Sequence, residues 1–120
     1  MIFLLSSVNL SSQTENFTIT GGAGIDILRG GKGNDIITSD GAYDVLYGGD
    51  GDDSLTGGED NDELSGGSGA DTFNIDAGND TITTTAAVAE SLDSGNHTWD
   101  FGAGTDTLAL SDVTTGLNDD

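Results

Sequence analysis

A nine-residue repeat is the feature that most constrains what this chain can fold into. Seven consecutive units fill residues 21–83 without an insertion or deletion: GGAGIDILR, GGKGNDIIT, SDGAYDVLY, GGDGDDSLT, GGEDNDELS, GGSGADTFN and IDAGNDTIT. Self-similarity at a short fixed period predicts a solenoid, in which a unit buries its apolar side chain only by stacking on its neighbours.

Two positions of the unit never change in character. The sixth is always aspartate (Asp26, Asp35, Asp44, Asp53, Asp62, Asp71 and Asp80), and the eighth is always large and apolar (Leu28, Ile37, Leu46, Leu55, Leu64, Phe73 and Ile82). Positions seven to nine indicate a three-residue strand whose central side chain points inward. Its neighbours point outward and are mostly polar, among them Arg29, Thr38, Tyr47, Glu63 and Thr83.

Glycine dominates positions one, two and four of the unit. Because glycine permits positive φ and close backbone approach, we expect the first six residues to form a tight loop whose carbonyl oxygens turn toward one point. The sixth-position carboxylate adds a charged oxygen there. A donor set of oxygens alone is typical of a hard cation, and calcium suits it better than magnesium, which keeps several waters. No segment has the EF-hand loop pattern.

The charge of the chain explains why a cation is needed. Its 120 residues include 22 acidic and 2 basic side chains, a net charge of -20. A body this small and this charged repels itself, so it is either disordered or completed by something cationic. The same charge argues against binding to nucleic acid or to an anionic membrane surface. Without cysteine there is no disulfide or thiolate metal site, and no apolar run approaches the roughly 18 residues of a membrane-spanning helix.

Catalysis is not expected. His97 is the only histidine and lies in an irregular stretch without a nucleophile motif, where an exposed loop residue is the ordinary reading. Lys32 is followed by Gly33, so the glycines form no phosphate loop. Paired carboxylates would suit a glycosidase, but the repeat already explains them.

The units match the pattern G-G-x-G-x-D-x-U-x, in which U is large and apolar, and those at 21–29, 30–38, 48–56 and 66–74 match it at every fixed position. The chain thus resembles the hemolysin-type, or RTX, calcium-binding region. The resemblance is strong over residues 21–83. It is weaker over 98–112, TWDFGAGTDTLALSD, which resembles the segment that closes such rolls, and GSGADTFNI at 67–75 resembles their last repeats.

The resemblance implies a right-handed parallel β-roll, all-β, with two units per coil and with loops on two opposite edges. Calcium would sit between loops two repeats apart. One edge, here the Asp35 edge, has the loops that end in Asp35, Asp53 and Asp71; the other, the Asp26 edge, has those that end in Asp26, Asp44, Asp62 and Asp80. Besides the seven aspartates, the expected ligands are the first and third residues of the complete loops: Gly21, Ala23, Gly30, Lys32, Gly48, Asp50, Gly66 and Ser68.

The two edges are not equal in sequence. All units on the Asp35 edge have every glycine, whereas on the other edge Ser39-Asp40 and Ile75-Asp76 replace the glycine pair, and Ala42 and Asp60 replace the third glycine. A non-glycine residue at positive φ costs roughly 1 kcal/mol. We therefore expect two strong calcium sites on the Asp35 edge and up to three weaker ones on the Asp26 edge. About five ions would roughly halve the charge imbalance.

The chain is expected to divide into an N-terminal strand or cap segment (1–20), the repeats (21–83) and a C-terminal cap and tail (84–120). Residues 86–92 favour either a short helix or an irregular loop, and four large side chains are expected to cap the roll: Trp99, Phe101, Leu108 and Leu110. Asp100 and Asp106 are further ligand candidates. Residues 1–5 are apolar but lack the basic flank and cleavage site of a secretory signal.

The predicted function is a calcium-binding module that is secreted and folds outside the cell, where calcium is abundant. RTX proteins commonly leave through a one-step exporter that reads a C-terminal signal, although residues 116–120 are short and acidic. Two alternatives stay open. One is a module that binds polysaccharide or a cell surface, with Tyr43 and Tyr47 stacking on sugars; the other is the C-terminal part of a larger toxin, protease or lipase.

Overall fold

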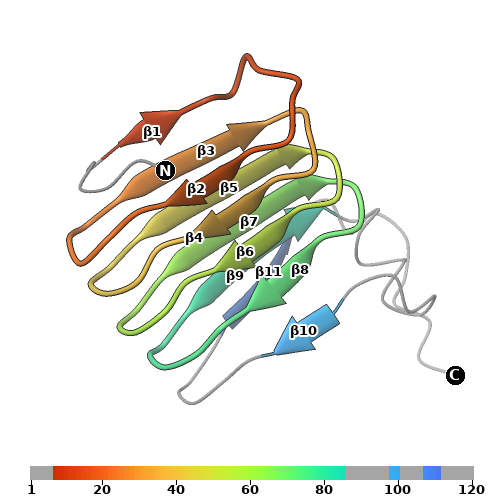
Figure 1. Ribbon diagram of the computed structural model, residues 1–120. Coiled ribbons are helices and arrows are strands. Elements are labelled where there is room, and N and C mark those ends of the chain that lie inside the picture. Colours follow the sequence, from red (N-terminus) through yellow and green to blue (C-terminus); the bar gives the residue numbers. More distant parts are fainter. Residues whose placement is uncertain (1–6, 86–97, 101–106, 112–120) are drawn as a thin grey trace, which may run out of the picture.

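The structure, a computed structural model, describes residues 7–85, 98–100 and 107–111. Two parallel sheets face each other across a narrow interior (Figure 1). The six-stranded sheet consists of β1 (Val8–Asn9), β3 (Ile27–Gly31), β5 (Val45–Asp50), β7 (Glu63–Ser68), β9 (Thr81–Thr85) and β11 (Thr107–Ser111). The five-stranded sheet consists of β2 (Thr18–Thr20), β4 (Ile36–Thr38), β6 (Ser54–Thr56), β8 (Thr72–Asn74) and β10 (Thr98–Asp100).

The chain alternates between the sheets, one nonapeptide to each, so that a coil takes two units. Within the repeats every strand pairs with the strand two units away: Leu28 with Leu46 in one sheet, and Ile37 with Leu55 in the other. This arrangement confirms the predicted parallel β-roll. No helix in the described ranges is long and apolar enough to span a membrane.

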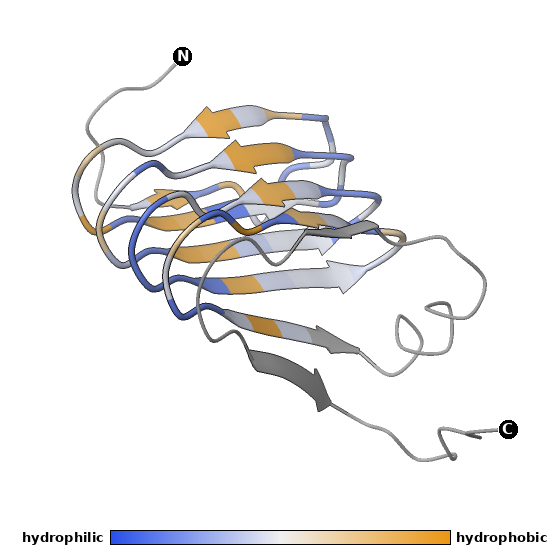
Figure 2. Ribbon diagram, turned by 90° about the horizontal axis from the view of Figure 1, so that it is seen from below, coloured by the Kyte–Doolittle hydropathy of each residue, from blue (hydrophilic) through white to orange (hydrophobic). Residues whose placement is uncertain are grey.

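The core is a thin double ladder of the eighth-position side chains. All seven are at most 1 % exposed, and Val8, Ile19 and Ile75 extend the ladder. Figure 2 shows these apolar residues as matching bands that cross successive strands. Because each unit contributes one such residue, the core depends on the stacking of neighbouring coils, as the repeat predicts.

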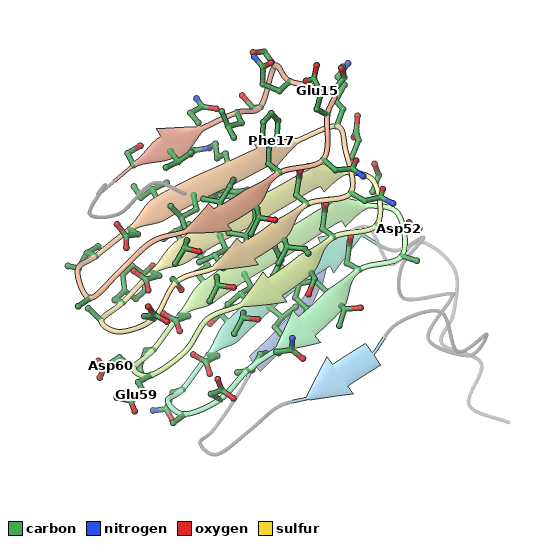
Figure 3. All side chains as sticks on the ribbon, in the orientation of Figure 1. Glu15, Phe17, Asp52, Glu59 and Asp60 are labelled. Atoms are coloured by element: carbon green, nitrogen blue, oxygen red, sulfur yellow. The ribbon has the colours of Figure 1, made fainter. Side chains whose placement is uncertain are left out.

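Residues 8–20 already belong to the roll. Ile19 pairs with Ile37, and Val8 pairs with Leu28, 20 residues further on, so the first coil has a longer turn than the repeats. Phe17, labelled in Figure 3, stands at the position that aspartate holds in every repeat. The predicted boundary at residue 20 therefore separates two sequence patterns within one continuous pair of sheets.

The segment after the repeats adds a strand to each sheet. Trp99 of β10 pairs with Phe73, and Leu108 of β11 pairs with Ile82. At these strands the closing segment continues the two sheets, and the predicted capping role of its large side chains stays a prediction. Phe101, Asp106, His97 and the short helix or irregular loop predicted over 86–92 lie outside the described residues.

The glycines of the loop have two different roles, whereas the sequence suggested one role, positive φ and close approach, for all of them. Positive φ occurs at positions two and four, as at Gly49 (φ 121°) and Gly51 (φ 118°). A side chain on Gly49 would collide with the carbonyl oxygen of Gly31 in the preceding coil. The first-position glycines are absent from the positive-φ set, and their role is described below. Ala42 (φ 76°) and Asp60 (φ 74°) adopt positive φ without being glycine, as predicted for the Asp26 edge.

Candidate metal centre

All seven sixth-position aspartates are buried, with exposures of at most 3 %. Each one ends a loop and immediately precedes a strand, so its backbone is held by the sheet while its side chain folds back into the loop. The carbonyl groups of Asp35 and Asp53, for example, accept hydrogen bonds from Ser54 and Thr72 of the next coil, both at 2.8 Å. The loops of the two edges lie on opposite sides of the roll; Figure 3 labels Asp52 on the Asp35 edge and Glu59 and Asp60 on the Asp26 edge.

In six of the seven aspartates, all except Asp26, Oδ1 accepts a hydrogen bond that ties its coil to the preceding one. Oδ1 of Asp53 accepts a hydrogen bond from the backbone N–H of Asp35 at 2.7 Å, and Oδ1 of Asp71 accepts one from Asp53 at 3.0 Å. The same bond recurs on the other edge, where Asp44 accepts from Asp26 and Asp62 accepts from Asp44. In the first coil the N–H of Phe17 donates to Asp35. These bonds form two ladders that run along the roll.

In four of the aspartates the other carboxylate oxygen, Oδ2, has no hydrogen bond within the described part of the chain. Oδ2 is fully buried, and no donor among the described residues reaches it in Asp26, Asp35, Asp53 or Asp62. A buried carboxylate that is not paired costs several kcal/mol, unless it is protonated or bound by a cation. The loops are therefore built around an oxygen that still requires a positive partner.

The pKa values of these groups reflect that requirement. Burial raises the pKa of Asp53 from an ordinary 3.8 to about 7, against the opposing effect of the hydrogen bond from Asp35, and the neighbouring charges of Asp71 and Asp35 raise it further. Burial raises the pKa of Asp62 to about 7 in the same way. It also raises the pKa of Asp26 and of Asp44.

The first-position glycines make room for Oδ2. A methyl carbon placed on Gly30 would overlap Asp35 Oδ2 and lie 2.8 Å from the carbonyl oxygen of Gly48 in the next coil. A methyl carbon on Gly48 would likewise overlap Asp53 Oδ2 and lie 2.7 Å from the carbonyl oxygen of Gly66. A carboxylate oxygen and a carbonyl oxygen from consecutive coils therefore face the same small space. We call the space beside a first-position residue its cradle.

On the Asp26 edge two of the four cradles are filled by side chains. Ser39 replaces glycine, is completely buried, and donates from Oγ to the carbonyl oxygen of Gly57 at 2.5 Å. Ile75 also replaces glycine and turns into the apolar core. Only Gly21 and Gly57 keep the space open on this edge. A methyl carbon on Gly57 would lie 2.5 Å from Asp62 Oδ2.

The donor set fits calcium. Carboxylate and carbonyl oxygens from two coils are hard ligands, and calcium accepts them in flexible geometry. The described residues contain no group of three or more His, Cys, Asp or Glu side chains placed around one point. Backbone carbonyls would therefore have to supply most of the ligands, with one aspartate from a loop, and this agrees with the abundance of glycine.

The remaining predicted ligands occupy the outside of the loops. The third-position side chains of Ala23, Lys32, Asp50 and Ser68 are exposed, and Ser68 Oγ donates to Asp50 Oδ1 at 2.9 Å. These four residues could therefore bind calcium only through their backbone carbonyl oxygens. The ligand role of these residues and of the first-position glycines stays a prediction.

A further set of inter-coil hydrogen bonds, made by side chains at position five, was missed from sequence. Asn16 Oδ1 accepts from the N–H of Asn34 at 2.8 Å, Asn34 Oδ1 accepts from Asp52 at 2.9 Å, and Asp52 Oδ1 accepts from Ala70 at 2.8 Å. Asn61 accepts from Asn79 on the other edge. These side chains accept from the following coil, whereas the sixth-position aspartates accept from the preceding one. The signal was the Asn or Asp at position five of four units.

Comparison with known proteins agrees with this geometry. The sequence model of the RTX calcium-binding nonapeptide repeat matches residues 18–46 and 47–82 in four copies, which together cover more than half of the chain. The chain belongs to the RTX calcium-binding repeat family. It has no match among curated proteins or solved structures. RTX repeats bind Ca²⁺, so the chain contains a calcium-binding module, and the β-roll is the structural scaffold of that module.

The inequality of the edges predicts that the aspartates differ in importance. Replacing Asp53 by Asn keeps an Oδ1 that accepts the hydrogen bond from the backbone N–H of Asp35. It removes the negative charge beside the open cradle of Gly48. The RTX roll should then need at least about tenfold more calcium to fold, since even outer-shell changes weaken metal sites that much. Asp44→Asn, beside the cradle filled by Ser39, should shift the midpoint less. Far-UV circular dichroism during calcium titration measures both, and equal shifts would contradict the distinction.

Filling a cradle tests the same idea without changing an aspartate. Gly48→Ser should reproduce Ser39, with Oγ donating to Gly66, so that the RTX roll still stacks while the space beside Asp53 is occupied. We expect its folding midpoint in calcium to rise by about tenfold. Gly57→Ser on the Asp26 edge is the matched control and should raise the midpoint less. Calorimetric calcium titration of both variants provides the measurement, and an unchanged Gly48→Ser midpoint would exclude the cradle as a calcium site.

The raised pKa values predict how the calcium-free roll responds to pH. The pKa of Asp53 and Asp62 is about 7 in the folded chain and near 3.8 when they are unfolded, so the folded state binds more protons between these values. Stability from protonation is then fully present below about pH 4 and lost as pH rises through 7. In calcium-free buffer the β-signal should grow as pH falls from about 8 to about 4. A β-signal that grows as pH rises would contradict this sign.

Proposed function

We propose that this chain is a calcium-triggered folding module of a secreted protein, unfolded where calcium is scarce and folded outside the cell. The observation that supports it is the buried, unpartnered Oδ2 in the loops of both edges. In four units, a buried carboxylate oxygen without a hydrogen-bond donor makes the folded state less stable in the absence of a cation. A ligand that removes the cost converts binding energy into folding energy.

The charge of the chain supports the same proposal. At a net charge of -20 the free chain repels itself, and the extended state relieves that repulsion. A chain held unfolded in this way suits a one-step exporter that passes unfolded polypeptide. Extracellular calcium modules have dissociation constants of roughly 10⁻⁴–10⁻³ M. Such a module therefore binds calcium outside the cell but not in the calcium-poor cytoplasm. The module would serve a larger secreted protein, such as a toxin, protease or lipase.

Protease protection tests the trigger across the two calcium ranges. The chain should be digested completely at submicromolar calcium and should leave a protected core spanning the repeats at about 1 mM, with no protection by magnesium at the same concentration. Fractionation of the source cells tests export: the parent protein should accumulate in the medium. Protection that is equal with and without calcium would contradict the trigger, and retention of the parent protein inside the cells would contradict secretion.

A second candidate function, binding of polysaccharide at or near a cell surface, is favoured by one observation. The two tyrosines and the two cations of the chain gather on β3, β5 and the loops that flank these strands.

A further inference from the structure

The outer face of the six-stranded sheet changes in character along the roll. At β3 and β5 its rows contain Ile27, Arg29, Val45 and Tyr47, whereas the paired positions of β7 and β9 contain Glu63, Ser65, Thr81 and Thr83. Ile27 is 37 % exposed. The apolar and aromatic residues of this face thus end where β7 begins.

The adjoining loops extend this patch. Ile25 is 61 % exposed and Tyr43 is 45 % exposed, and the hydroxyl of Tyr43 donates to Glu63 at 3.0 Å, which places its side chain against the row that begins with Ile27. Arg29 lies over the Tyr47 ring, 4.7 Å from its centre. Both tyrosines and both basic residues of the chain therefore belong to this patch, which we call the β3–β5 patch: Ile25, Ile27, Arg29, Lys32, Tyr43, Val45 and Tyr47.

A shallow hollow lies at the end of the patch that contains Lys32. Arg29, Tyr47 and Lys32 line it together with Ser11 and Asp50, and glycines form its floor. Gly31 and Gly49 are paired across β3 and β5, so no side chain interrupts the floor. A flat, extended ligand can lie there in contact with the Tyr47 ring and within reach of both cations.

We infer that the β3–β5 patch binds a carboxylate-bearing polysaccharide, a chain of uronic acid units lying in this hollow. Aromatic side chains provide an apolar face with a polar tip, which suits a sugar ring. The Arg29 guanidinium, already oriented by Tyr47, is suited to a carboxylate, and Lys32 adds a second positive charge. Elsewhere the acidic surface repels a polyanion, so charge confines such a ligand to this patch. The inference deepens the second candidate function and uses the calcium-folded roll only as its scaffold.

The test is an NMR titration of the calcium-loaded chain with a trimer of galacturonic acid at saturating calcium. Shifts of the backbone amide signals should be confined to residues 27–32 and 45–50. Arg29→Gln should weaken binding by about tenfold, the loss of one charge-assisted hydrogen bond. Tyr47→Ala should weaken it similarly, and Ser65→Ala, at the next position of the same row, should leave it unchanged.

Several outcomes would overturn the inference. They are shifts confined to loop residues outside 27–32 and 45–50, equal binding of the neutral galactose trimer, tighter binding of a sulfated trimer, Arg29→Gln binding as well as the unaltered chain, or no saturable shift by about 10 mM trimer. A protein partner that occupies the same face in place of the sugar would overturn it as well. Circular dichroism of the same samples shows whether the roll has folded, so failure of the calcium trigger is distinguished from failure of sugar binding.

Discussion

Each of the seven repeats places a carboxylate inside the fold, and much of the rest of the structure follows from that burial. The aspartate must precede the strand so that its backbone stays in the sheet while Oδ1 reaches the previous coil. It must be small enough to fold back over the first residue of its own loop. That residue must in turn lack a side chain wherever Oδ2 and a carbonyl of the next coil are to share one cation. The place of the aspartate before the strand and the glycine at the first position of the loop both follow from this requirement.

The same constraint makes the stability conditional. The apolar core has one large side chain per unit, a thin interior for a chain with 22 acidic residues. The hydrogen bonds that Oδ1 accepts fix the register between coils. In Asp26, Asp35, Asp53 and Asp62, however, Oδ2 is buried without a hydrogen-bond donor from the described residues. A bound cation supplies what the core does not, and so folding and ion binding become one process.

Much of this was predictable because the repeat is regular. The buried eighth position, the parallel roll and the calcium-binding family were all predicted from residues 21–83, and all are confirmed. The inter-coil hydrogen bonds of position five were not predicted, because a hydrogen bond such as that between Asn34 and Asp52 depends on which loop atoms face each other once the coils have stacked. The roles of Phe17 and of the strands at 98–100 and 107–111 were missed in part, because they join the sheets outside the period of nine. The ligand set stays a prediction, since carbonyl oxygens leave no signature in a side-chain pattern.

The central claim is that calcium and folding are inseparable in this chain. Far-UV circular dichroism of the purified chain during a calcium titration at pH 7.5, with magnesium and sodium at matched ionic strength as controls, tests it most directly. We predict a cooperative change from coil to β-structure with calcium alone, with a midpoint of about 10⁻⁴–10⁻³ M. A β-signal already complete in chelator at that pH, or one induced equally by magnesium, would contradict the claim.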